Sequence, residues 1–322
     1  MDNYSSSGCP LNESNTRNYP ITLSLLDLEH GSVIHSPKNE TSFWTIFTFA
    51  WSSVGIALSA AALALLILTA VLFAEWRKNY KNQQLIQFML ARFLYTSVRF
   101  FADIQYMFQI CAISERSVFL DILAVIYSEL VLIAWMFVFS RQIYIGLVKV
   151  FTTENANIWT VSLCAWLGPA VAALLLNLLF YAGHDTNHRY LLIYILLVKW
   201  PILISNAVLL IKALRSVLKN NMNPENNTKI VIVMIILIFT FCFQQMVLDI
   251  CKIAFFKLTL RKTVISIVLT VSNIISMYHC AFSVVFWVLG NANTRKLWRF
   301  RGKELRGKIR VSVRISALSS QK

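Results

Sequence analysis

The sequence has 322 residues, of which 57% are apolar and only 14% charged, with 30 Lys and Arg against 15 Asp and Glu. Soluble domains have roughly 25% charged and about 45–50% apolar residues, so this composition excludes an ordinary soluble protein. The net charge of +15 would indicate nucleic-acid binding in a soluble chain. In so apolar a chain, the position of the cations along the sequence is more informative than their sum.

Seven segments are long and apolar enough to cross a bilayer as helices. A helix needs ~20 residues to cross a hydrocarbon core of ~30 Å. The predicted fold class is an all-α membrane protein, a seven-transmembrane helix bundle without internal repeats. The second, third and fifth spans contain charges, so their bounds follow less directly from hydropathy. We expect the spans at Phe43–Ala74, Leu85–Phe108, Val118–Gly146, Ile158–Ala182, Tyr190–Leu218, Lys229–Phe256 and Thr263–Leu289.

The distribution of cations between the loops predicts the orientation. With the N-terminus outside, 19 Lys and Arg fall on the inner side and 8 on the outer side. Because Lys and Arg collect in cytoplasmic loops, this arrangement favours an outer N-terminus and an inner C-terminus. We therefore expect an extracellular tail over 1–42, a bundle over 43–289 and a cytoplasmic basic tail over 290–322, in the plasma membrane.

The N-terminal tail supports the same orientation. Asn3, Asn12 and Asn39 each begin an Asn-X-Ser/Thr triplet, the acceptor for N-glycosylation in segments outside the cytoplasm. Cys9 and Cys111 would face the oxidising side, and whether they pair is left open. No cysteine or histidine spacing is typical of a metal site. The sequence thus predicts no metal, no cofactor and no catalytic residues, and the protein is not expected to be an enzyme.

Two charges inside the third and fifth spans are expected at similar depth. Glu129 lies about eleven residues below the outer end of its span and Lys199 about nine below its own. At 1.5 Å per residue their depths agree within ~3 Å, so they can pair if the helices are neighbours. Such a pair is either the floor of a ligand cavity or a structural salt bridge.

Further polar and aromatic residues fall in the outer half of the predicted bundle. A charge at the membrane centre costs about 2.5–3.5 kcal/mol on insertion scales and usually faces the bundle interior. A small-molecule pocket uses such polar groups together with aromatic walls. With Glu129 and Lys199, the candidate ligand-binding residues are Asp103, Tyr106, Trp135, Trp200, Gln245, Asp249, Tyr278 and His279.

Cations also occur towards the inner side. Arg92 and Arg141 lie in the inner halves of their spans, where a long side chain can extend to the lipid headgroups or lock two helices together. In the tail, Leu297, Trp298 and Leu305 among basic residues predict a short helix on the membrane surface. Anionic lipids attract such cations at ~1 kcal/mol each, which accounts for most of the net charge without nucleic acid.

Seven helices, outer sequons and a basic tail resemble a G-protein-coupled receptor. The rhodopsin-like motifs are absent, since Ser140–Gln142 stands where an acidic-Arg-Tyr triplet would end the third helix. Bitter taste (type 2) receptors are the more similar family. Leu90–Arg92 resembles the start and end of their Leu-Ala-x-Ser-Arg, Trp135–Phe139 resembles their Trp-Leu-x-Val-Phe, and Leu289–Asn291 with the basic residues after it resembles the end of their last helix.

Secretin-like receptors are the second resemblance. Lys78–Tyr80 is similar to their Arg-Asn-Tyr, Trp166–Pro169 to their Trp-Gly-x-Pro, and Lys199–Ser205 to their Lys-x-Pro-Ile-Leu-x-Ser. A tail of 42 residues with one cysteine is too small for their hormone-binding domain.

The resemblance implies a receptor, chemosensory and taste-receptor-like, that binds a small-molecule or peptide agonist and activates a heterotrimeric G protein. Its other partners would be membrane lipids, and no nucleic acid is expected. The alternatives are a secretin-like peptide receptor without the hormone-binding domain and a membrane transporter. Cations near the inner ends of the helices would contact the G protein: Arg141, Arg215, Lys219, Lys229, Arg295 and Lys296.

Overall fold

The computed structural model is helical throughout the part of the chain that it describes, which is residues 41–107, 115–148, 157–182, 192–219, 231–232, 234–257, 262–285, 288 and 293–301. The three sequons, Cys9, Cys111 and Lys229 lie outside these residues. The elements are α3 (Thr41–Leu72), α4 (Ala74–Lys78), α5 (Tyr80–Met107), α6 (Glu115–Val148), α7 (Ile158–Ala182), η1 (Tyr194–Lys199), α9 (Trp200–Lys219), η2 (Phe239–Phe243), α11 (Gln244–Lys257) and α12 (Lys262–Val284).

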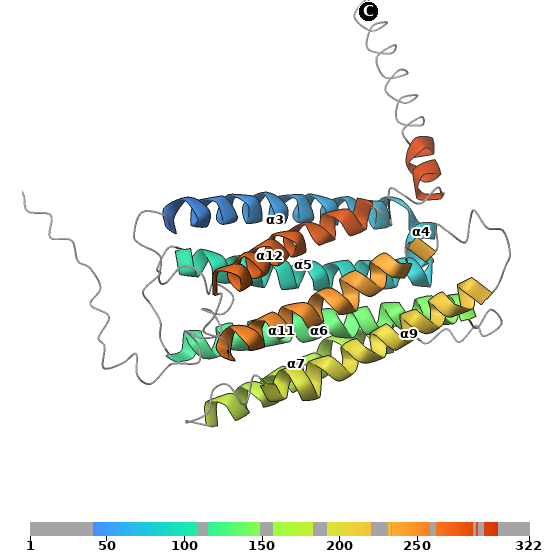
Figure 1. Ribbon diagram of the computed structural model, residues 1–322. Coiled ribbons are helices and arrows are strands. Elements are labelled where there is room, and N and C mark those ends of the chain that lie inside the picture. The colour runs from blue at the N-terminus through green and yellow to red at the C-terminus, as the bar shows by residue number, and fades with distance from the viewer. Residues whose placement is uncertain are drawn as a thin grey trace, which may run out of the picture.

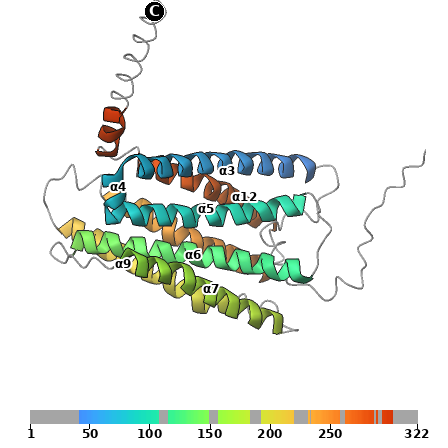
Figure 2. The same cartoon turned by 180° about the vertical axis from the view of Figure 1, so that it is seen from behind.

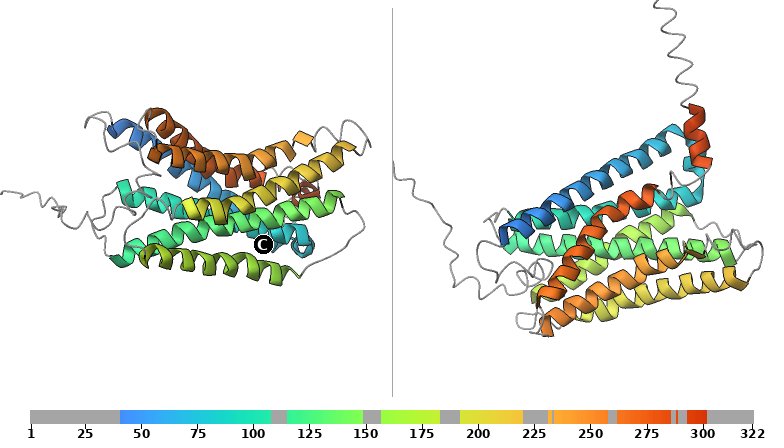
Figure 3. Two further views of the ribbon diagram at one scale, coloured as in Figure 1. Left: turned by 60° about the horizontal axis from the view of Figure 1, so that its bottom comes forward. Right: turned by 45° about the horizontal axis from the view of Figure 1, so that its top comes forward.

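The long helices lie side by side along a common direction (Figure 1, Figure 2). The centre of the bundle is α6, which packs against α5, α7 and α9, while α3 packs against α12 and α5. Of the apolar stretch of α6, 56% is buried inside the protein, against 17% for α7. The left view of Figure 3 accordingly shows α7, in yellow-green, along the lower edge of the bundle.

Four helices are long and apolar enough to cross a membrane: Ile46–Leu72, Leu120–Val148, Ile158–Leu179 and Tyr194–Lys219, counted within the described residues. The expectation of an all-α membrane protein is therefore confirmed. Seven spans and the orientation stay predictions. The third and fifth predicted spans qualify despite their charges, because the long apolar stretches around these charges keep the mean hydropathy at 2.3 and 2.0. Glu129 and Lys199, near the middle of these spans, are buried inside the bundle.

Polar residues at the helix ends explain where the observed helices differ from the predicted spans. The second predicted span began at Leu85, whereas α5 begins at Tyr80. The Asn79 side chain accepts a hydrogen bond from the Lys81 backbone N–H at 3.0 Å and so caps the helix. Asn157 caps α7 in the same way through Trp159, at 3.1 Å. Hydropathy marks only the part of a helix that lies in hydrocarbon, so it misses such polar turns.

A short helix over 293–301 follows α12 and lies beside α4 (Figure 1). The Trp76 indole donates a hydrogen bond to the Thr294 hydroxyl at 3.1 Å. The Trp298 ring packs edge-on against Phe73, with the ring centres 5.5 Å apart. These contacts fix the helix against the end of α3, while Arg295 and Lys296 remain exposed.

The crossing of α3 and α12 depends on a glycine. A Cβ atom at Gly55 would lie 2.8 Å from the Met277 Cβ and 3.1 Å from the Tyr278 ring. One turn along α3, the Ser59 hydroxyl donates a hydrogen bond to the Met277 carbonyl at 2.6 Å. Such a close approach of two backbones is possible only because Gly has no side chain.

We expect Gly55→Val to lower the free energy of unfolding by about 1–3 kcal/mol, because the new methyl groups must push α3 and α12 apart. Gly168 is the matched control, since nothing lies within 4 Å of a Cβ placed there. Gly168→Ala should leave the stability unchanged or raise it by up to ~1 kcal/mol through helix propensity. Thermal unfolding of the purified protein in detergent measures both, and equal melting temperatures for the two variants would contradict this role for Gly55.

Candidate functional site

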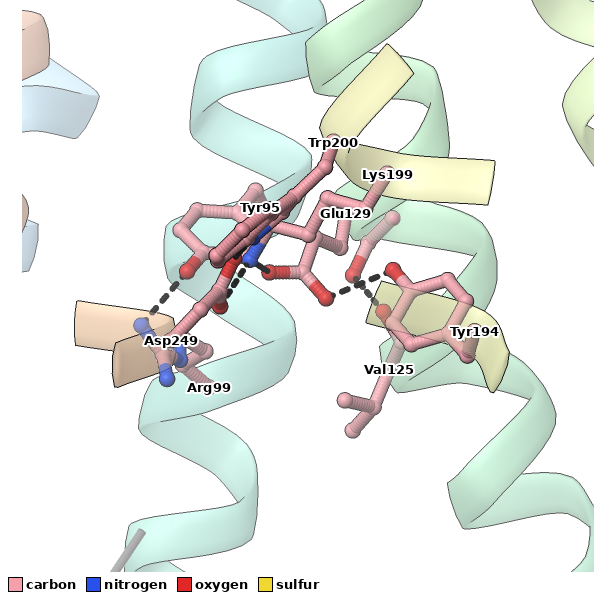
Figure 4. A network of polar contacts seen from close by, with 9 residues as sticks. Tyr95, Arg99, Val125, Glu129, Tyr194, Lys199, Trp200 and Asp249 are labelled. Atoms are coloured by element: carbon pink, nitrogen blue, oxygen red, sulfur yellow. Dashed lines mark hydrogen bonds and ion pairs between the residues drawn. The ribbon is translucent and has the colours of Figure 1, made fainter. Parts of the chain in front are cut away.

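A buried lysine joins three helices in the interior of the bundle (Figure 4). The Lys199 ammonium lies 2.6 Å from Glu129 Oε1 on α6 and 2.5 Å from Asp249 Oδ1 on α11. All three side chains are almost completely enclosed. We refer to Glu129, Lys199 and Asp249 as the charged triad.

The other two carboxylate oxygens of the charged triad also accept hydrogen bonds. The Tyr194 hydroxyl donates to Glu129 Oε2 at 2.7 Å, and the Trp200 indole N–H donates to Asp249 Oδ2 at 3.2 Å. Each of the four oxygens therefore has a donor in the described structure. This matters energetically because a buried ion pair is tolerated only when its remaining lone pairs are satisfied.

A π-helical segment shapes this site. Tyr194 and Lys199 begin and end η1, and they are five residues apart. An α-helix places residues three or four apart on one face, whereas a π-helix closes hydrogen bonds between residues five apart. The wider turn brings both side chains to Glu129. Pro201 lies two residues after Lys199. Because proline has no N–H and its ring clashes with the preceding turn, regular α-helical bonding to that turn is excluded.

The network extends to α5 through a tyrosine and an arginine (Figure 4). The Arg99 guanidinium donates a hydrogen bond to the Tyr95 hydroxyl at 2.5 Å and also lies 5.0 Å from the centre of the Tyr95 ring. Tyr95 and Arg99 are both buried. Four helical segments of the bundle, α5, α6, α11 and the η1–α9 segment, therefore contribute to one polar network.

The predicted pairing of Glu129 with Lys199 is confirmed, and the structure adds Asp249 as a third member. Trp200, a predicted aromatic wall, contributes its N–H to Asp249. Gln245 is buried one turn from Asp249 on α11. Asp103 and Tyr106 belong to α5, but their side chains lie outside what the structure describes.

Three other candidate residues make their contacts elsewhere. Trp135 lies about 9 Å deeper than Glu129 along α6 and packs against Trp166, with ring centres 6.4 Å apart. The Tyr278 hydroxyl donates to the Trp51 carbonyl on α3 at 3.0 Å. His279 shares a hydrogen bond with Ser283 of its own helix, with Nδ1 and Oγ 3.1 Å apart.

Sequence reasoning missed Tyr194, Tyr95 and Arg99. Tyr194 was not predicted, because its side chain lies on the same face as Lys199 only where the helix forms a π turn. A π turn has no simple sequence signal. Arg99 was visible as a charge inside a span, but its partner Tyr95 is an ordinary aromatic residue one turn away. A usable signal was present in the spacing: Tyr95 and Arg99 are four residues apart, so they share a helix face. That face lies near the depth predicted for Glu129 and Lys199.

Of the two alternatives expected for Arg92, extension to the lipid headgroups is not what the structure shows. Its side chain has no exposed surface, because α5 directs it into the bundle rather than towards lipid. Arg141 and the other cations assigned to the inner side, Arg215 and Lys219, are exposed on α6 and α9. Among the described residues, no group of three His, Cys, Asp or Glu side chains could hold a metal ion.

The fold and the site together define an all-α membrane protein with a buried charged triad, in which every carboxylate oxygen accepts a hydrogen bond. No family model matches the sequence, and no curated protein is significantly similar to it.

Proposed function

We propose that this chain is a G-protein-coupled receptor of the plasma membrane, chemosensory and taste-receptor-like, that binds a small molecule in the outer half of the bundle. The charged triad is the main observation in support. Ionisable residues inside membrane helices are costly and typically mark functional sites. Here three of them join α6, the η1–α9 segment and α11. A ligand that binds one of these charges can weaken such a connection.

The helices around the charged triad are interrupted by π-helical segments. Such interruptions would allow the helices to change their arrangement when a ligand binds. The π-helical segment η1 ends at Lys199, and η2 immediately precedes α11, the helix of Asp249. Short π segments occur frequently at functional sites. A ligand that competes for one carboxylate would favour a second arrangement of α11 against α9, and it would shift the balance by its difference in affinity for the two.

The proposal assigns the exposed cations of the inner side to G-protein contact. Arg141 on α6 and Arg215 and Lys219 on α9 are exposed, as are Arg295 and Lys296 on the helix over 293–301. A basic surface increases the rate of association with an acidic partner surface.

A secretin-like peptide receptor and a transporter are the competing proposals. Buried charges also occur along the ion pathways of transporters, so the charged triad fits that function as well. Transporters more often have inverted repeats and glycine-broken helices, whereas this chain has 9 glycines and no detectable repeat.

The test is guanine-nucleotide exchange on a panel of G proteins, in membranes from cells expressing the chain. Bitter compounds and peptide hormones are applied separately. We expect a concentration-dependent response to a small molecule that Lys199→Ala abolishes and that Lys78→Ala, an exposed cation on α4, leaves unchanged. A response to peptides alone would favour the secretin-like receptor. No exchange with any ligand, together with solute flux into vesicles containing the protein, would show a transporter instead.

A further inference from the structure

Arg92 is a buried cation without a partner. It has no exposed surface, and its Nε, Nη1 and Nη2 atoms form no hydrogen bond within the described structure. A guanidinium group has five N–H donors and no acceptor. A charge enclosed in this way is strongly unfavourable unless it is paired, so Arg92 requires an acceptor that the described residues do not supply.

The charges buried in the bundle do not balance. The buried ionisable side chains among the described residues are three cations, Arg92, Arg99 and Lys199, and two carboxylates, Glu129 and Asp249. Both carboxylates are bound to Lys199, and Arg99 interacts with Tyr95. Arg99 belongs to the same polar network as the charged triad, so the two cations and two carboxylates of that network balance. The remaining positive charge is at Arg92.

The helix that faces Arg92 has no carboxylate to pair with it, since α12 contains no Asp or Glu over Lys262–Val284. The charge of Arg92 acts on His279 and Cys280 of α12. Ser276 lies one turn away on the same face of α12, and its buried hydroxyl also has no partner in the described structure. A thiol and a hydroxyl can donate to an anion but cannot neutralise a guanidinium.

We propose that Arg92 binds a small monovalent inorganic anion, chloride under cellular conditions, between α5 and α12. Because Arg92 is completely enclosed, the side chains around it must move apart to admit even a small ion, and a lipid phosphate or a large organic anion would require far more space. Water would accept hydrogen bonds from the guanidinium but would leave its charge uncompensated. The site lies below the charged triad and does not depend on the receptor function proposed above.

Thermal unfolding of the full-length protein in detergent tests this site. At constant ionic strength, sodium chloride should raise the melting temperature by roughly 5 °C over sodium gluconate, because an ion that binds only the folded state stabilises it. Sodium bromide should act as chloride does. Arg92→Gln should remove the difference between the two salts, whereas Arg92→Lys, which keeps the cation, should retain part of it.

Lys212→Gln is the matched control, since Lys212 is an exposed cation on α9, and it should keep the full chloride effect. Equal melting temperatures of the unaltered protein in chloride and gluconate would overturn the proposal, as would a full chloride effect in Arg92→Gln. If Arg92→Gln does not fold, crystals of the unaltered protein in sodium bromide decide the question. An anomalous peak within hydrogen-bond distance of the Arg92 guanidinium supports the site, and its absence there overturns it.

Discussion

Replacing Lys199 with methionine is expected to lower the free energy of unfolding by about 3–5 kcal/mol, the cost of removing one partner from a buried ion pair. Methionine has nearly the length of lysine, so the change removes the charge with little change in packing. Glu129 and Asp249 would then lie close together without the shared cation, with Tyr194 and Trp200 as the donors that remain. The measurement is the melting temperature in detergent, which should fall by about 10 °C for this loss of stability.

The same reasoning predicts a rescue. The triple variant Glu129→Gln, Lys199→Met and Asp249→Asn removes all three charges at once, and replacing a complete buried ion pair by neutral groups is often close to neutral. We expect it to recover most of the stability lost in Lys199→Met alone. Lys212→Met controls for the substitution on an exposed part of α9 and should melt near the unaltered protein. A Lys199→Met variant as stable as the unaltered protein would show that the charged triad contributes little to folding.

The second large effect is expected from Asp249→Asn, on the basis of the proposed receptor function. The amide keeps the size of the carboxylate but loses the 2.5 Å ionic bond to Lys199, which joins α11 to the η1–α9 segment. If this bond favours the resting arrangement by about 1.4 kcal/mol, its loss raises the active population about tenfold. We therefore expect raised nucleotide exchange on the G protein in the absence of any agonist.

Glu129→Gln should raise the basal activity less than Asp249→Asn. α6 and α9 pack against each other extensively. The ionic bond of Glu129 to Lys199 therefore contributes a smaller share of the interaction between these helices. Asp121→Asn is the matched control, because Asp121 lies on α6 outside the polar network and is only half buried. Basal exchange is measured at equal surface expression. If Asp249→Asn is as inactive as Asp121→Asn, the bond between α11 and α9 does not restrain activation.

Local properties of the sequence were sufficient to predict the helices. In hydrocarbon every backbone N–H and C=O must be satisfied within the chain, so a long apolar segment has to be helical. This is why α7 begins and ends where the sequence predicts. The common depth of Glu129 and Lys199 was equally accessible, because helical rise converts a residue count into a distance.

What the sequence could not determine is which helices are neighbours and how each is rotated. The packing of α9 against α6, and of η2, which precedes α11, against α9, brings Asp249 to Lys199. The π turn η1 allows Tyr194 to reach Glu129. The packing of the bundle also encloses Arg92, for which the sequence alone left open extension to lipid headgroups or a lock between two helices. These outcomes depend on contacts between segments far apart in the chain, whereas apolarity and helical rise are properties of each segment by itself.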